Sequence, residues 1–74
     1  MKLTELKKGE RALIRRVDAD AELRSRLHSF GVIPGEELTL KGCSLGRKTM
    51  EIEIDGTLIA LRREEAEKIQ VEKL

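Results

Sequence analysis

Residues 49–61 read TMEIEIDGTLIAL, and this stretch decides the fold that the sequence predicts. Apolar and polar side chains alternate strictly over residues 49–54, which is the period of a strand with one buried face. Asp55 and Gly56 come next, and this pair favours a type I′ turn because both central residues of that turn need a positive φ. Residues 57–61 then return as a second strand. The stretch therefore predicts an antiparallel hairpin.

Toward the N-terminus, the sequence predicts two more strands with a helix between them. Residues 11–17 are rich in Leu, Ile and Val, and apolar residues alternate with polar ones over residues 38–41. Leu23, Leu27 and Phe30 recur at the spacing i, i+4 and i+7, which places them on one face of a helix. We therefore expect an amphipathic helix of about ten residues that turns these three side chains toward the core.

Capping and turn signals bound this helix. Asp18 or Asp20 could accept a hydrogen bond from the backbone at its start. Gly31 directly follows the apolar stripe, where a left-handed residue commonly ends a helix. Pro34-Gly35 predicts a type II turn, because proline presets φ for the second position and glycine accepts the positive φ of the third.

The remaining segments complete one small, mainly β domain over residues 1–74. Residues 3–6 and 62–68 each predict about one helical turn, residues 42–48 a loop and residues 69–71 a short closing strand. About five short strands favour a barrel, because a barrel removes exposed sheet edges. We expect a small SH3-like antiparallel barrel with the helix inserted after its first strand. Short edge strands could still pair between molecules, which leaves a homo-oligomer open.

The composition excludes several classes of function. Fifteen basic and fourteen acidic residues leave a net charge of +1, which argues against coating nucleic acid or an anionic membrane. Phe30 is the only aromatic residue, so the chain lacks the aromatic platforms of single-strand binders and of proline-rich peptide readers. No apolar run approaches the roughly 20 residues of a membrane span, and no signal peptide is recognisable. The single Cys43 fits a reducing compartment, so we expect a cytoplasmic protein.

Candidate catalytic and metal-binding groups are sparse. Cys43 and His28 are the only cysteine and histidine; nothing supports a catalytic pair, and one of each cannot complete a four-ligand zinc site. No phosphate-binding P-loop occurs. Glu51, Glu53 and Asp55 alternate along a strand and could attract a hard cation, but the same pattern is typical of a solvated strand face. We expect no catalytic residue, metal or cofactor, although Cys43 or His28 could take up metal between molecules.

Three segments, in the expected order, resemble the FeoA family of ferrous iron transport proteins. Residues 26–35, RLHSFGVIPG, resemble the family signature Arg-Leu-x-x-(Leu/Phe)-Gly-(apolar)-x-Pro-Gly. Residues 56–71, GTLIALRREEAEKIQV, resemble the family's closing segment, and residues 3–9, LTELKKG, are similar to its usual start. One departure is the loop at residues 43–48, CSLGRK, which keeps a Leu-Gly pair but lacks the two prolines common in the family. Contacts made by this loop are therefore expected to differ here.

The resemblance implies an SH3-like, cytoplasmic accessory protein of FeoB, the membrane ferrous-iron permease with a cytosolic GTPase domain. Part of the signature serves folding, namely Leu27, Phe30, Gly31, Pro34, Gly35 and Gly56. Residues without an obvious folding role are the candidates for contact with the partner: Arg26, His28, Val32, Ile33, Leu45, Arg47 and Arg62.

Two alternatives to this function remain open. The family also resembles the C-terminal SH3-like domain of iron-dependent transcriptional repressors, so the chain could be a detached sensing or interaction module. Such a regulator would need a helix-turn-helix to bind DNA, and the chain has room for only one substantial helix. A hydrolase that uses Cys43 is the third hypothesis. The charge run at residues 62–68 is either a solvated turn or a recognition patch, with Arg62 its strongest candidate for recognition.

Overall fold

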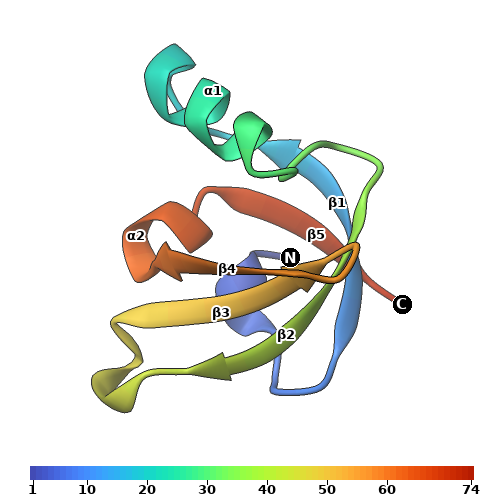
Figure 1. The fold of residues 1–74 in the computed structure, drawn as a ribbon, viewed down its shortest axis with the longest axis vertical. Helices are drawn as coiled ribbons and strands as arrows, with labels where there is room; N and C mark the ends of the chain where they lie inside the picture. The colour runs from blue at the N-terminus through green and yellow to red at the C-terminus, as the bar shows by residue number, and fades with distance from the viewer.

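The computed structural model describes residues 1–74 and contains one five-stranded sheet in which every neighbouring pair is antiparallel. The strand order is β4-β3-β2-β1-β5. Figure 1 shows the sheet curving strongly from β4 round to β5. The mainly β fold with five strands is confirmed, and the strands are β1 (Arg11–Val17), β2 (Glu37–Cys43), β3 (Thr49–Ile54), β4 (Thr57–Arg62) and β5 (Ile69–Lys73).

Helical segments are short and lie between strands or before them. The longest, α1 (Ala21–Ser29), follows β1 as expected, and α2 (Arg63–Ala66) joins β4 to β5. Two 3-10 turns complete the chain, η1 (Leu3–Glu5) and η2 (Leu45–Arg47). The second lies within the connection predicted as a loop, and the positive φ values of Gly46 and Arg47 show that it is an irregular turn.

The β3–β4 hairpin forms in the predicted register. Ile54 pairs with Thr57 across the two-residue turn, and Asp55 and Gly56 have φ values of 51° and 83°. The positive φ at both positions confirms the turn prediction. Burial alternates along β3 as predicted: Met50, Ile52 and Ile54 are buried, whereas Thr49 and Glu51 are exposed.

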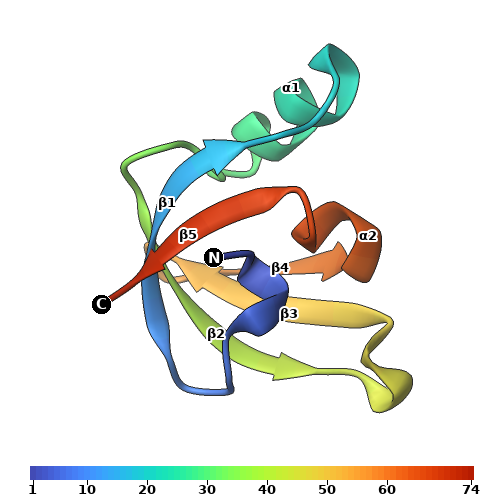
Figure 2. The same ribbon diagram turned by 180° about the vertical axis from the view of Figure 1, so that it is seen from behind.

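The sheet is not closed into a complete barrel. Its end strands, β4 and β5, do not pair with each other. The outer edge of β5 is covered by the N-terminus: Lys2 bridges to Gln70, and the Val71 N–H donates to the Met1 carbonyl at 2.7 Å. Figure 2 shows η1 beside β5 in this position. A closed barrel was expected to leave no exposed sheet edge, but β4 keeps one unpaired edge.

α1 ends in a Schellman turn that brings Val32 into the core. The Gly31 N–H donates to the His28 carbonyl at 3.0 Å, and the Val32 N–H donates to the Leu27 carbonyl at 3.0 Å. Gly31 has the positive φ of 96° that this motif requires. The motif usually pairs these two apolar residues, and here both Leu27 and Val32 are at most 1% exposed. The expectation that Val32 is a surface contact is therefore wrong.

The prediction that Phe30 faces the core is also wrong. Its side chain is 50% exposed, whereas Leu27 is fully buried and Leu23 is only partly buried against the core. α1 projects from one end of the sheet in Figure 1, so only part of its apolar stripe reaches the core. Seventeen apolar side chains form that core, with no buried polar residue among them.

Pro34-Gly35 forms the predicted turn between α1 and β2. The Glu36 N–H donates to the Ile33 carbonyl at 3.0 Å, which closes a four-residue turn. Gly35 has a φ of 97°, the value that a type II turn needs at its third position.

Candidate docking surface

The β2–β3 connection lies at the end of the molecule remote from α1 (Figure 1), and Leu45 belongs to this connection. Two hydrogen bonds join the base of this connection: the Ser44 N–H donates to the Thr49 carbonyl, and the Thr49 N–H donates to the Ser44 hydroxyl, both at 3.0 Å. The Arg47 N–H donates to the Ser44 carbonyl at 2.9 Å and closes the turn within it. Leu45 takes no part in these hydrogen bonds, and it is 98% exposed.

Basic side chains surround an open hollow next to Leu45. The hollow is lined by residues 46–49 and 62–64, so it joins the β2–β3 connection to the end of β4 and the start of α2. Glu64 is the only acidic residue among them. We call Leu45 and the four cations of this hollow the tip patch: Leu45, Arg47, Lys48, Arg62 and Arg63.

Most cations of the tip patch have no carboxylate partner. Five of the eight arginines in the chain form ion pairs with carboxylates, among them Arg63 with Glu67 at 3.4 Å. Two of the three arginines that do not, Arg47 and Arg62, lie in the tip patch, and Lys48 is also unpaired. The guanidinium of Arg47 donates only to the Thr4 carbonyl, at 3.2 Å. The tip patch therefore carries uncompensated positive charge.

Arg47 also has a strained backbone. Its φ is 57°, in the left-handed region that costs a residue with a Cβ roughly 1–2 kcal/mol. The preceding Gly46 has a φ of 76°. Strained positions of this kind cluster at active sites, ligand clamps and switch regions.

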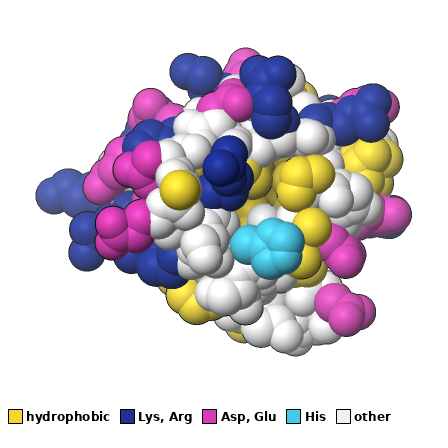
Figure 3. Space-filling model, turned by 90° about the horizontal axis from the view of Figure 1, so that it is seen from above, with side chains coloured by type: hydrophobic (Ala, Val, Ile, Leu, Met, Phe, Trp, Pro, Cys, Tyr) yellow, Lys and Arg dark blue, Asp and Glu magenta, His cyan; other side chains and the backbone are white.

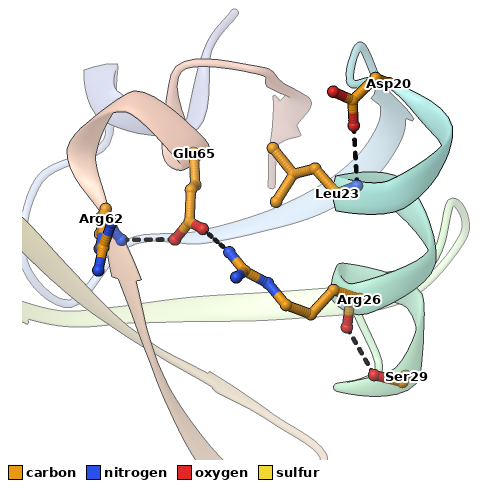
Figure 4. A network of polar contacts seen from close by, with 6 residues as sticks. All are labelled: Asp20, Leu23, Arg26, Ser29, Arg62 and Glu65. Carbon is orange, nitrogen blue, oxygen red and sulfur yellow. Dashed lines mark hydrogen bonds and ion pairs between the residues drawn. The ribbon is translucent and has the colours of Figure 1, made fainter.

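Arg26 of α1 and Arg62 at the end of β4, two of the predicted contacts, both bind the Glu65 carboxylate, as Figure 4 shows. The Arg26 guanidinium pairs with the Glu65 Oε2, and the backbone N–H of Arg62 donates to the Glu65 Oε1 at 2.9 Å. The Glu65 side chain is only 12% exposed. Arg26 therefore helps to hold α1 against α2, whereas the side chain of Arg62 remains free because only its backbone takes part.

The other predicted contacts near α1 differ in exposure. His28 is exposed, and Figure 3 shows the single histidine beside hydrophobic side chains at this end of the molecule. Ile33 is only partly exposed, and Val32 is buried. The structure thus separates the predicted contacts into two groups, Arg26 and His28 on α1, and Leu45, Arg47 and Arg62 in the tip patch.

A second, apolar surface lies at the unpaired edge of β4. Phe30 and Leu58, 50% and 56% exposed, line a shallow hollow together with Ser29 and residues 57–60. This surface was not predicted from the sequence, because the helical periodicity assigned Phe30 to the core. The surface exists because α1 projects beyond the end of the sheet, so that Phe30, which follows α1, is not covered by the core.

Potential metal ligands are not gathered on either surface. No group of three or more His, Cys, Asp or Glu side chains lies close enough to hold a metal ion. Cys43 is exposed and forms no disulfide. No helix has the length and apolar character needed to cross a membrane.

Lys48 and Arg63 were not among the predicted contacts, although Arg63 lies in the charge run at residues 62–68 and the hairpin register contains both residues. Because Ile54 pairs with Thr57, counting back along both strands sets Thr49 opposite Arg62 and then Lys48 opposite Arg63. The structure confirms this register, since the Arg63 N–H donates to the Lys48 carbonyl at 2.9 Å. The signal was therefore present in the two-residue turn.

Comparisons with known proteins agree on one family. The model of the FeoA domain matches residues 1–73. A protein of Campylobacter jejuni, provisionally named Fe(2+) transport protein A, is 41% identical over 71 residues, which is 96% of each chain. A fusion protein of Porphyromonas gingivalis, named Fe(2+) transport protein A/Fe(2+) transporter FeoB, is 36% identical over 97% of this chain. The matching segment is 8% of the fusion protein.

Solved structures of similar sequence share the fold. FeoA from Chlorobium tepidum has a TM-score of 0.94 and 38% identity, over 100% of this chain and 70% of that one. FeoA from Stenotrophomonas maltophilia, solved with zinc and described as a prokaryotic SH3 domain protein, has a TM-score of 0.84 and 28% identity, over 97% and 89% of the two chains. A manganese-dependent transcriptional repressor has a TM-score of 0.90 at 21% identity over 41% of its own chain, a likeness of fold alone. The SH3-like architecture is thereby confirmed.

Proposed function

The chain belongs to the FeoA family, and from that premise we propose that it is an accessory protein of ferrous iron uptake that docks on a FeoB-type transporter. Docking modulates the activity or the assembly of the transporter. The protein acts in the cytoplasm, at the membrane periphery when bound, and performs no catalysis itself.

The observation that carries this proposal is the fusion protein of Porphyromonas gingivalis. One polypeptide there joins a segment 36% identical to this chain to a FeoB transporter. Covalent linkage keeps the two parts at a high effective concentration, which is useful when they act together. A separate chain of the same family would have to reach its transporter by docking, through a surface of its own.

The side chains support an accessory role over an enzymatic one. A nucleophile needs a base within hydrogen-bond reach and a third group that orients this base. Cys43 lies at the end of β2, His28 lies on α1, and neither has a hydrogen bond through its side chain to another residue. A partner would therefore bind to the exposed surface of the molecule and not within an enclosed cleft.

A repressor-type function is the second candidate, and it has less support. Its basis is the likeness of fold to a manganese-dependent repressor. DNA recognition by such proteins uses a helix-turn-helix, and α1 is the only helix of this chain longer than four residues. Sequence-specific DNA binding by the purified chain in a gel shift would favour this second candidate.

The proposed function is tested in the organism that encodes the chain. We expect deletion of its gene to lower the initial rate of ferrous iron uptake, and the intact gene in trans to restore it. Affinity-tagged protein should co-purify with FeoB from detergent-solubilised membranes, and a strain without FeoB provides the control for unspecific capture. Normal uptake in the deletion strain together with no recovery of FeoB would refute the proposal.

A further inference from the structure

We propose that the tip patch is the docking surface, and that the partner contributes an acidic segment with an apolar side chain that packs on Leu45. This inference rests on the proposed function, because it takes the FeoB-type transporter as the partner. It adds which end of the molecule binds and the chemistry that the transporter must present there.

Leu45 has the properties of an apolar anchor. It is the most exposed of the large apolar side chains in the molecule, at 98%. The hydrogen bonds between Ser44 and Thr49 close the base of its loop, so the side chain is displayed from an ordered turn. Residues that dominate an interface commonly sit at its centre with polar groups around them. Burial of Leu45 by a partner would produce this arrangement.

The charge of the tip patch defines the partner segment as acidic. Arg47, Lys48 and Arg62 have no carboxylate partner within the chain, whereas most other arginines do. An arginine guanidinium can bind a carboxylate through two parallel hydrogen bonds, which gives direction as well as attraction. Side chains of Asp or Glu on the partner would therefore be complementary to the tip patch.

A protein segment fits this surface better than a membrane or a nucleic acid. The chain has a net charge of only +1, and Glu64 lies in the same hollow as the cations. Polyanions are bound through broad fields of positive charge, and a carboxylate inside the site opposes them. A small cluster of cations with one carboxylate, beside a single apolar anchor, is instead suited to a defined protein partner.

Arg47 permits a variant that separates docking from folding. The residue has a φ of 57°, and an added Cβ at the neighbouring Gly46 would meet nothing within 4 Å, so the turn is open to solvent. Glycine adopts this backbone conformation without strain. Arg47→Gly therefore removes a cation, together with its one exposed hydrogen bond to the Thr4 carbonyl, while the backbone of the turn is kept.

The experiment measures the affinity of the full chain for full-length FeoB of the same organism, purified in a neutral detergent. We expect Leu45→Ser, Arg47→Gly and the double variant Arg47→Glu/Lys48→Glu each to weaken binding, the double variant by at least about tenfold. Leu58→Ser and Arg24→Glu are matched controls: Leu58 is an exposed leucine on β4, and Arg24 is an unpaired arginine on α1. Both controls should bind like the wild type. Added salt should weaken the wild type more than the double variant.

The outcomes distinguish this inference from the proposed function. Wild-type affinity of the double variant, with uptake still lost on gene deletion, would place docking elsewhere and leave the accessory function intact. Loss of binding with Leu58→Ser alone would assign docking to the β4 edge and overturn the inference. Co-sedimentation with anionic lipid vesicles that depends on Arg47 and Lys48, without any affinity for FeoB, would overturn both.

Discussion

Leu27 lies in the last turn of α1 and Phe30 directly follows that helix as its C-cap, yet the two residues of this apolar stripe should differ strongly in their contribution to stability. Leu27 is fully buried, whereas half of the Phe30 side chain is exposed. Leu27→Ala should lower the free energy of unfolding by about 2–5 kcal/mol, because it leaves a cavity in the core. Phe30→Ala should lower it by only about 1 kcal/mol or less.

Urea denaturation followed by circular dichroism measures both values, and Leu45→Ala, at a fully exposed apolar position, is the control with no expected change. A loss on Phe30→Ala as large as that on Leu27→Ala would mean that Phe30 packs into the core in solution. Val32 gives the reason for the asymmetry: the Schellman turn places it in the core beside Leu27, so the core is filled without Phe30.

At the scale of the elements, two ion pairs lie at the ends of β1: one joins the residue before β1 to the end of β5, and the other joins β1 to the residues that follow it. The Lys73 ammonium lies 2.6 Å from the Glu10 Oε2, and this hydrogen bond, followed by that from the Lys7 N–H, holds the pKa of Glu10 below its ordinary value. The Arg16 guanidinium lies 2.5 Å from the Asp18 Oδ1 and likewise lowers the pKa of Asp18. Both carboxylates are therefore more acidic in the folded chain than in the unfolded one.

This difference predicts the direction in which stability depends on pH. Glu10 and Asp18 stabilise the fold at pH values above their ordinary pKa values of 4.5 and 3.8. Below these values the unfolded chain takes up protons first, so the contribution is lost as the pH falls further through the folded pKa values. The melting temperature should therefore fall on acidification from about pH 6 to about pH 3.

Glu10→Gln isolates one of the two groups. We expect the variant to melt below the wild type at neutral pH and to approach it in acid, because only the wild-type carboxylate loses its charge. High salt should reduce the difference, since the pair is near the surface. An unchanged difference across the whole pH range would show that the Lys73 pair does not hold in solution.

At the scale of the whole molecule, the first six residues complete the fold although they contribute no strand. Leu3 and Leu6 are at most 2% exposed, and they belong to the same core cluster as residues of all five strands. The Met1 ammonium donates to the Val71 carbonyl at 3.1 Å, and the Val71 N–H donates back to the Met1 carbonyl. The N-terminus thus covers the β5 edge and fills the interior of the curved sheet.

Leu3→Ala should therefore destabilise the protein about as much as a central core substitution, by about 2–5 kcal/mol. A domain of this size has only a few kcal/mol of stability, so a large fraction of the variant should be unfolded at 25 °C. Near-ultraviolet signals are weak without Trp or Tyr, so far-ultraviolet circular dichroism and dispersion of amide NMR signals are the suitable measurements. Thr4→Ala, at a partly exposed position of η1, is the control. A fully folded Leu3→Ala would contradict the role of η1 as part of the core.

Features that depend on residues close together in the sequence were predicted correctly, whereas the burial of Phe30 and Val32, which depends on tertiary packing, was not. β1 and β3 agree with the predicted ranges, and the turns at Pro34-Gly35 and Asp55-Gly56 form as expected. Their signals lie within a few residues of the chain, in the alternation of side chains and in the backbone freedom of glycine. The predictions for Phe30 and Val32 were wrong because helical periodicity does not say where the sheet beneath a helix ends.

The sequence by itself determined the strands, their hairpin register, the turns and the family, because each of these follows from residues that are neighbours along the chain. Only the tertiary structure decided which exposed side chains share a surface. Leu45 and Arg62 are 17 positions apart, and it is the antiparallel pairing of β3 with β4 that places the end of β4 beside the β2–β3 connection. The open edge of β4 also depends on the curvature of the whole sheet, which is the sum of many small twists and cannot be read from any one segment.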